Sequence, residues 1–349
     1  MTKRLGLLKK YGKYSIAGAI FFLLVITLLI FHFGPRIFYR YFGHLLLDKV
    51  ETRLSEKQIR QIQEGVSGLK AKVVFSSSRT GNHEIFMLTL PEIQTYQLTH
   101  HPHVNYFPRF SPDGEKIIFA RSQITWVSER DEDPWDVYLL SLQTGKETLL
   151  ARDANYPQWV DTGRISFSRK NKVIIKDLGT GHEKIILDGM ESPISGSVGT
   201  PEFSPKDPRF LVLTTRGKLD GVIFWDLLKR QYFLFGGGCE ITWFPQGNEV
   251  LWVENGGNGG TQMPRSSATH DNKTLFMDLP GEFSHEYFPR LSRDGKWLVW
   301  GASSGGHEHD LADYEIFLWK VGTPFSRAVR LTYNPANERW PDIFIMPKQ

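Results

Sequence analysis

Short runs of alternating apolar and polar residues repeat along most of the chain, and turns rich in Gly, Pro and Asp separate them. The segment Tyr106–Arg121 reads YFPRFSPDGEKIIFAR, and Tyr287–Ala302 reads YFPRLSRDGKWLVWGA. Each predicts a strand, a tight turn and a second strand, because the glycine of Asp-Gly accepts the positive φ of a hairpin turn. Weaker copies lie between the two. A strand–turn–strand unit that recurs along a chain is typical of a β-propeller.

The repeat also predicts the number of blades. The residue two positions after the recurrent proline, or after the residue in its place, recurs at intervals of 40 to 52 residues, at Phe110, Trp159, Phe203, Trp243, Leu291 and Ile343. The run at Lys72–Ser77 looks like a second strand with no first strand ahead of it, and Asn337–Ile345 looks like a first strand with nothing after it. Together they make one blade. We therefore predict an all-β, six-bladed β-propeller over residues 71–349, closed by the C-terminal strand, which leaves no open sheet edge.

The unit that starts at Trp243 is less regular than the others. Its run TLFMDL, Thr274–Leu279, is interpreted as the third strand of that blade, and its fourth strand is obscure. The preceding stretch 255–270 is rich in Gly and Asn, which predicts a mobile loop, either a lid or a tolerated insertion.

These motifs carry a family resemblance. The pattern FSSSR, EIF, YQLT and YFPRFSPDGEKIIFAR between Phe75 and Arg121 resembles the repeats of TolB-type propellers, and the resemblance covers roughly residues 71–349. It implies a propeller fold. It implies no single activity, because this superfamily includes periplasmic interaction scaffolds, propeller domains of prolyl-oligopeptidase-like enzymes and oligogalacturonate lyases.

The N-terminal region predicts a membrane anchor. Residues 14–33 carry no formal charge and are long enough to span a bilayer as a helix. The basic tail 1–13 precedes them, so the positive-inside rule predicts a cytoplasmic N-terminus and a propeller in the periplasm or outside the cell. No small-residue cleavage site follows, which favours an uncleaved signal anchor. Residues 34–70 are predicted to be a helical connector, with a capping box at Ser55–Gln58 and a helix end at Gly65.

Composition narrows the classes of function. The net charge of +4 is concentrated in the basic tail, and no basic stripe runs through the repeats, so nucleic-acid binding is not expected. Cys239 is the only cysteine, which rules out an internal disulfide and predicts a buried, inert thiol. The chain lacks the G-x-S-x-G elbow and hydrolase domain that a serine peptidase of this superfamily needs.

Propeller topology sorts the connections onto two faces. If strands a to d run outward from the axis, the b–c and d–a connections share one face, here called the loop face, and the a–b and c–d turns share the other, the turn face. The loop face holds the long loops 122–135, 255–273 and 303–314, and eight of the nine propeller histidines. Binding residues concentrate on loops carried by a rigid scaffold, so the loop face is the predicted binding face. Its acidic run Glu129–Asp133 is expected to face solvent.

Polar residues of the first and last blades are predicted to converge on the loop face. The candidates for binding are Arg79, His83, Glu84, His101, His103, His307, His309, Asp310 and Asp313. Imidazoles beside carboxylates offer nitrogen and oxygen ligands for a divalent metal, so His307, His309, Asp310 and Asp313 are also the candidate metal ligands. Two alternatives remain open: a metal-free ligand site, and a hydrogen-bonded cluster that only holds the closing strand.

A second set of polar residues occupies one position in every first strand. These residues are Arg109, Gln158, Glu202, Thr242, Arg290 and Asp342, and we expect them to line the central channel. Around the ring, Asp342 would lie between Arg290 and Arg109 and share an ion pair with both.

Two functional hypotheses follow. The first is a membrane-tethered, non-catalytic propeller that serves as a scaffold for a protein or glycan partner and needs no cofactor. The alternative is a metal-dependent polysaccharide lyase or hydrolase that uses the histidine-rich loop face and a divalent metal.

Overall fold

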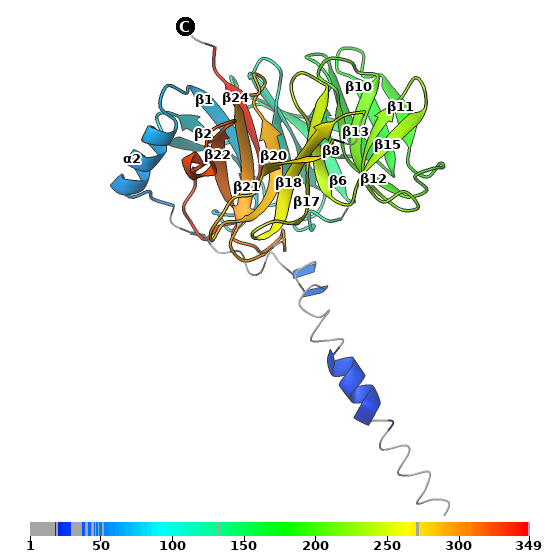
Figure 1. The fold of residues 1–349 in the computed structure, drawn as a ribbon, viewed down its shortest axis with the longest axis horizontal. Helices are drawn as coiled ribbons and strands as arrows, with labels where there is room; N and C mark the ends of the chain where they lie inside the picture. Colours follow the sequence, from blue (N-terminus) through cyan, green and yellow to red (C-terminus); the bar gives the residue numbers. More distant parts are fainter. Residues whose placement is uncertain are drawn as a thin grey trace, which may run out of the picture.

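The computed structural model describes residues 18, 20–28, 37–38, 41–42, 45, 47, 49–50, 52–131, 133–269, 272–306 and 308–347. Within these residues the strands form six four-stranded antiparallel sheets, arranged as blades around one axis (Figure 1). The fold is therefore an all-β, six-bladed β-propeller, and the blade number predicted from the repeat is confirmed.

The strands of each blade follow one another outward from the axis. The closing blade contains β24 (Glu338–Ile345), β1 (Ala71–Ser77), β2 (Glu84–Leu90) and β3 (Gln94–Gln97). The next blade contains β4 (Asn105–Phe110), β5 (Lys116–Ser122), β6 (Trp135–Ser141) and β7 (Glu147–Ala151), and it is followed by β8 (Asn155–Trp159), β9 (Arg164–Arg169), β10 (Lys172–Asp177) and β11 (Glu183–Asp188).

The other three blades have the same order. They contain β12 (Ser197–Phe203), β13 (Phe210–Arg216), β14 (Gly221–Asp226) and β15 (Gln231–Gly236); β16 (Cys239–Trp243), β17 (Glu249–Gly256), β18 (Gly260–Ser267) and β19 (Thr274–Met277); and β20 (His285–Leu291), β21 (Trp297–Ser303), β22 (Glu315–Lys320) and β23 (Val329–Arg330). A short 3₁₀ helix, η2 (Phe325–Arg327), precedes β23.

The C-terminal strand closes the ring. β24 pairs antiparallel with β1, with Lys72 opposite Phe344 and Val74 opposite Asp342. The chain ends are thus joined within one sheet, as the two half-patterns in the sequence predicted. Closure leaves β1 and β24 without a free edge on their paired sides, so it protects backbone groups that would otherwise be open to another strand.

Every innermost strand is interrupted at the same position by a β-bulge. The register shifts there in all six strands, and the residue at the shift has a positive φ; these residues are Phe107, Tyr156, Thr200, Glu240, Phe288 and Trp340. In five of the six, proline follows directly. Proline has no N–H to donate, so it is tolerated where the ladder is already broken. This explains the recurrent proline of the repeat.

The blade that contains Trp243 differs from the prediction. Residues 255–270 were expected to be a mobile loop, but most of this stretch forms the hairpin between β17 and β18, with Gly256 paired to Gly260. The run TLFMDL therefore supplies the fourth strand, β19, and not the third. The error has a physical cause. The β18 sequence GTQMPRSS lacks apolar alternation, although Thr261 and Met263 are buried on one side of it.

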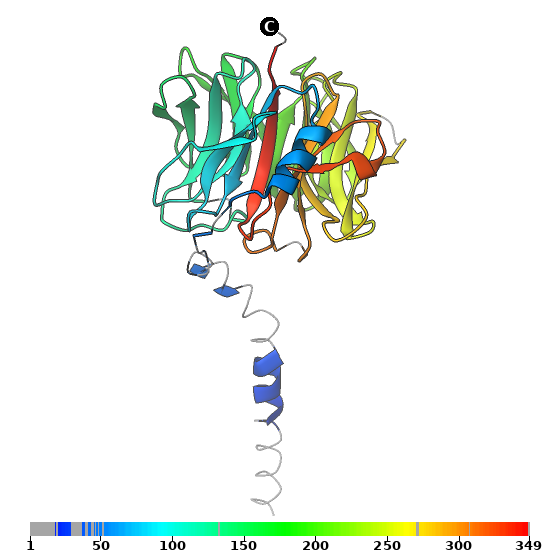
Figure 2. The ribbon, with the colours of Figure 1, turned by 90° about the vertical axis from the view of Figure 1, so that its left-hand side faces the viewer.

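The connector contains a helix shortly before the first strand of the propeller. α2 (Glu56–Gly65) has Ser55 as its N-cap, and Ser55 and Gln58 form the predicted capping box. The helix lies along the side of the propeller near β23 (Figure 2). A Cβ at Gly65 would lie 2.2 Å from Cγ2 of Val329, so glycine permits this close approach.

The predicted membrane span 14–33 lies partly outside the described residues. Among the residues that are described, none of the helices combines the length and apolar character that crossing a bilayer requires. The division into a tail at 1–13, a span at 14–33 and a connector at 34–70 stays a prediction.

Candidate functional site

The central channel opens into a pocket at each face of the disc. The pocket at the loop face has a volume of about 460 Å³ and is lined by Tyr156, Glu240, Tyr287 and Trp340, among other residues. The pocket at the turn face has a volume of about 500 Å³ and is lined by residues of all six innermost strands. These two pockets are the sites where the channel can accept a ligand.

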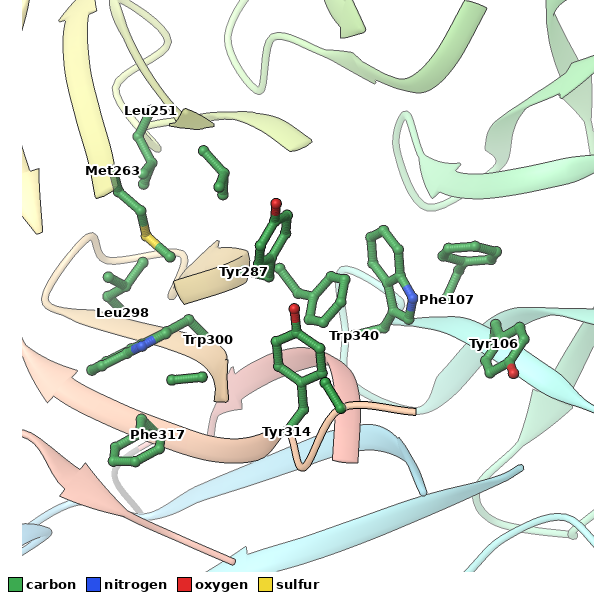
Figure 3. Close-up of a cluster of buried hydrophobic side chains, with 14 of the residues drawn as sticks. Tyr106, Phe107, Leu251, Met263, Tyr287, Leu298, Trp300, Tyr314, Phe317 and Trp340 are labelled. Carbon is green, nitrogen blue, oxygen red and sulfur yellow. The ribbon is translucent and has the colours of Figure 1, made fainter. Parts of the chain in front are cut away.

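Aromatic residues fill the middle of the disc. The ring of Trp340 packs with its centroid 4.4 Å from that of Phe107 (Figure 3). On its other contact, the centroid of Trp340 lies 4.4 Å from that of Phe288. All three have the positive φ of the bulge, which redirects their side chains from the ladder. The bulge ring therefore builds the aromatic centre of the propeller.

Of the three candidates from the closing blade, Arg79 and His83 contact the closing strand β24, and Glu84 contacts the segment 99–105 that leads into the next blade. Arg79 forms an ion pair of 2.8 Å with Glu338 of β24. His83 is fully buried, and burial, together with the charge of Arg339, holds its pKa well below the usual value. Glu84 is also buried, which raises its pKa, and it accepts hydrogen bonds from the Thr99 hydroxyl and the Asn105 amide. These side chains are already occupied by partners within the fold.

His101 and His103 lie together on the d–a connection of the same blade. The backbone N–H of His103 donates to Nδ1 of His101 at 3.1 Å, and Nδ1 of His103 lies 2.9 Å from the carbonyl oxygen of Ser122. Burial lowers the pKa of His101. The pair therefore stiffens the connection, and each ring uses one nitrogen for this purpose.

The candidates on loop 303–314 are also held by internal contacts, and His307 lies outside the described residues. His309 contacts the Glu129 carboxylate through Nδ1. Asp310 accepts from the Ser128 hydroxyl and lies 3.6 Å from Arg339. Asp313 accepts from Ser303, Ser304 and Gly305, which close its own loop.

A buried network around Arg339 joins these loops, and sequence reasoning did not find it. Nη1 of Arg339 forms an ion pair of 2.8 Å with Glu129, Nη2 lies 3.3 Å from Nε2 of His83, and the guanidinium stacks over Tyr106 at 4.7 Å. Glu129 is only 4% exposed, so the expectation that it faces solvent was wrong. Burial opposes its ionisation, but the charges of His309 and Arg339 outweigh burial and lower its pKa to about 2.

One sequence signal points to this network. Arg339 occupies the position that tyrosine holds in two other blades, at Tyr106 and Tyr287. A charged residue at an otherwise aromatic core position needs a buried partner of opposite charge, and the long b–c loop 122–135 supplies it. The convergence of the first and last blades on one face is thus real, but its chemistry is an ion-pair network that holds the closing strand.

No metal site is evident in the described part of the chain. None of its His, Cys, Asp and Glu side chains gather in a group of three or more that could hold a metal ion. Of the described metal candidates, His309 and Asp310 contact the loop 122–135, and Asp313 closes its own loop.

The loop-face pocket retains one carboxyl group without a cationic partner. Glu240 is 8% exposed, and its Oε2 accepts from the N–H of Phe288 at 2.6 Å. Burial raises its pKa well above the usual value. The neighbouring Cys239 is half-buried, less than predicted, and burial raises the pKa of its thiol, which favours the protonated form; that the thiol is inert stays a prediction. The side chains of Arg130 and Arg216 are 45% and 51% exposed at the rim.

The six polar residues of the first strands all line the turn-face pocket. This set contains Arg109, Gln158, Glu202, Thr242, Arg290 and Asp342. The expected ion pair through Asp342 is wrong. Arg290 pairs with Glu202, and Asp342 accepts from the backbone N–H groups of Phe110 and Ile343. Burial raises the pKa of Asp342, against the opposing charges of Arg109 and Arg290.

Fold and site together define a closed six-bladed β-propeller with a pocket at each mouth of its channel.

No family model and no curated protein sequence matches the chain. Solved structures do match it. TolB from Acinetobacter baumannii is 15% identical, with a TM-score of 0.59 over 83% of this chain and 74% of that one. A putative TolB from Agrobacterium tumefaciens is 12% identical, with a TM-score of 0.53 over 81% and 100%. One chain of a nidogen/laminin complex is 12% identical, with a TM-score of 0.52 over 78% and 98%. The chain thus has the TolB-like six-bladed propeller fold, and the likeness at these identities concerns the fold alone.

Proposed function

We propose that this chain is a membrane-tethered, non-catalytic propeller that binds a protein or glycan partner outside the cytoplasm through its loop face. One observation carries the proposal. The loop-face residues that resemble catalytic or metal-binding groups are engaged within the fold, while the channel mouth on the same face remains an open pocket of about 460 Å³. Aromatic walls with a few polar groups suit recognition of a partner's side chain or sugar ring.

The course of the connector supports a tether on this side of the disc. Lys49 forms a β-bridge with Thr80, and the N–H of Val50 donates to the carbonyl of Arg79 at 3.0 Å. Residues 79 and 80 lie in the β1–β2 connection, which belongs to the loop face. In Figure 2 the described N-terminal residues extend from this face and away from the C-terminus. An anchor at residues 14–33 would then hold the loop face toward the membrane.

The fold is compatible with a scaffold. The nidogen/laminin structure is a complex, and one of its chains shares this fold. A propeller of this fold can therefore take part in a protein complex.

Photo-crosslinking in cells tests the binding face. A benzophenone amino acid at Lys218, an exposed loop-face position, is expected to give a discrete adduct of the full-length chain. The matched position is Lys229, which is exposed on the turn face of the same blade. Arg216→Glu at the pocket rim is expected to reduce the Lys218 adduct several-fold. Adducts of equal yield at both positions, or at Lys229 alone, would refute binding through the loop face.

Metal removal separates the scaffold from the metal-dependent alternative. Purified full-length chain is expected to contain less than one metal ion per chain, and chelation with EDTA is expected to leave its melting temperature unchanged. The reason is that His309 and Asp310 already have partners within the fold. Stoichiometric metal that disappears in the His307→Ala/His309→Ala variant would instead favour a metal-dependent lyase or hydrolase.

A further inference from the structure

The turn-face pocket contains a buried arginine, Arg109, that forms no ion pair with a carboxylate of the described residues, unlike the other buried arginines. Four arginines are buried among the described residues: Arg109, Arg121, Arg290 and Arg339. Three of them form ion pairs with carboxylates, namely Arg121 with Glu147, Arg290 with Glu202 and Arg339 with Glu129. No carboxylate of the described residues lies within ion-pair distance of Arg109. A buried charge without a partner of opposite sign is costly, so this exception points to a partner from outside the chain.

The contacts of Arg109 leave part of its guanidinium unused. Nη1 donates to the carbonyl oxygens of Pro108 at 2.8 Å and Trp340 at 3.5 Å, and Nε is buried without any hydrogen-bond partner. The residue is 4% exposed and lines the pocket. Burial and the charge of Arg290 outweigh the more distant charges of Asp342, Glu202 and Glu240 and lower its pKa to about 9. A bound anion would offset both effects.

The acidic residues of the same pocket are occupied elsewhere. Glu202 receives hydrogen bonds from Arg290, from the Thr242 hydroxyl at 2.9 Å and from the N–H of Trp243 at 3.4 Å. Asp342 accepts from two backbone N–H groups. Neither carboxylate forms an ion pair with Arg109, so each offsets its charge only from a greater distance. The exposed side chains of Lys206 and Arg293 add positive charge at the rim.

Apolar residues form part of the wall of the pocket. They include the residue two positions after the recurrent proline, or after its equivalent Ile241, in each innermost strand, and these form a ring of Phe110, Trp159, Phe203, Trp243, Leu291 and Ile343. Trp159 and Trp243 are held in place by indole N–H donation to the carbonyls of Arg109 and Glu202. A cation beneath an apolar collar suits a ligand with an anionic head and a short apolar stem.

We propose that the turn-face pocket is an anion-binding site that accepts a carboxylate on a short apolar stem, with Arg109 as its buried cation. The planar guanidinium favours a carboxylate, whose two oxygens match its fork of donors. This site lies at the opposite mouth of the channel from the loop-face pocket, so it does not rest on the proposed function.

A ligand-observed NMR titration tests the proposal on the full-length chain in a non-ionic detergent. The probes are pentanoate and its neutral analogue pentanamide. Pentanoate is expected to bind saturably, and pentanamide at least about tenfold more weakly, because charge-assisted hydrogen bonds are about twice as strong as neutral ones. Arg109→Gln is expected to weaken pentanoate binding by about tenfold or more, without affecting pentanamide. Equal binding of the two probes, or unchanged binding by Arg109→Gln, would overturn the proposal.

Two further variants keep the test informative. Lys146→Gln removes the same charge from an exposed turn-face residue outside the pocket and is expected to leave binding unchanged. Arg293→Glu reverses an exposed charge at the rim, so its folding is not at risk, and it is expected to weaken pentanoate binding. If Arg109→Gln does not fold, unchanged binding in Arg293→Glu refutes the proposal in its place.

The source of the carboxylate is resolved by a third probe. Acetyl-alanyl-leucine carries the same group at the end of a peptide, and its C-terminal amide is the matched control. Tighter binding of the peptide than of pentanoate would identify a polypeptide C-terminus as the ligand, and tighter binding of pentanoate would identify a free small acid. Absence of the Lys218 crosslink would count against binding through the loop face but would not change the titrations at the turn-face pocket. The two proposals can therefore fail independently.

Discussion

Replacing Arg339 with alanine is expected to destabilise the folded propeller by about 3–5 kcal/mol, the cost of removing one partner of a buried ion pair. Arg339 is completely buried and pairs with Glu129 at 2.8 Å. Without it, Glu129 and Asp310 would remain buried beside each other with their main positive partner missing. The change can be measured as a shift in the denaturant midpoint of the purified chain.

A matched substitution and a double variant serve as controls for the effect of Arg339→Ala. Arg60→Ala removes an arginine from an exposed ion pair with Glu56 on α2 and is expected to cost less than about 1 kcal/mol. Adding Glu129→Gln to Arg339→Ala is expected to recover part of the lost stability, because it removes the uncompensated charge. An Arg339→Ala variant as stable as Arg60→Ala would show that the network does not hold the closing strand.

Deleting residues 338–349 is expected to abolish cooperative folding of the propeller. The deletion removes β24, the innermost strand of the closing blade, which pairs with β1 along most of its length. It also removes Trp340 from between Phe107 and Phe288, and it leaves the edge of β1 unpaired. Calorimetry should show no single unfolding transition, and amide exchange in β1 and β2 should lose its protection.

The control for this deletion is a shorter one. Removing residues 347–349 leaves β24 intact, together with the hydrogen bond from the N–H of Met346 to the carbonyl of Lys70, so the melting temperature should be unchanged. A cooperative transition that survives deletion of 338–349 would mean that the ring does not depend on its last strand.

The sequence predicted the repeat and its closure because both depend on local patterns. A strand needs alternating side chains and a hairpin needs Asp-Gly or Pro-Asp-Gly, and both signals are present in Tyr106–Arg121 without reference to the rest of the chain. The two half-patterns at Lys72–Ser77 and Asn337–Ile345 then required each other. β18 was not predicted because its sequence lacks regular apolar alternation, although neighbouring strands bury several of its residues.

The sequence predicted which residue types gather at the site and on which face, but not which side chains they contact. The candidates His83, His309 and Asp310 do gather around Arg339 and Glu129, as topology required, whereas Glu84 contacts Thr99 and Asn105 instead. Their partners, Arg339 and Glu129, were missed because nothing in a linear pattern identifies an ion pair between residues 210 positions apart (129 and 339). The position of the six channel residues was predicted for the same topological reason. Their pairing was not, because Arg290 forms its ion pair with Glu202 and not with Asp342 of the neighbouring blade.

The sequence by itself therefore determined the number of blades, their order, the closing strand and the face that carries the long loops. Each of these follows from local periodicity and chain connectivity. Only the tertiary structure decided how the polar side chains pair: Arg339 with Glu129, Arg290 with Glu202, and Arg109 with no carboxylate of the described residues. The physical reason is that ion pairs act over a few ångströms between side chains, and closing the ring sets those distances.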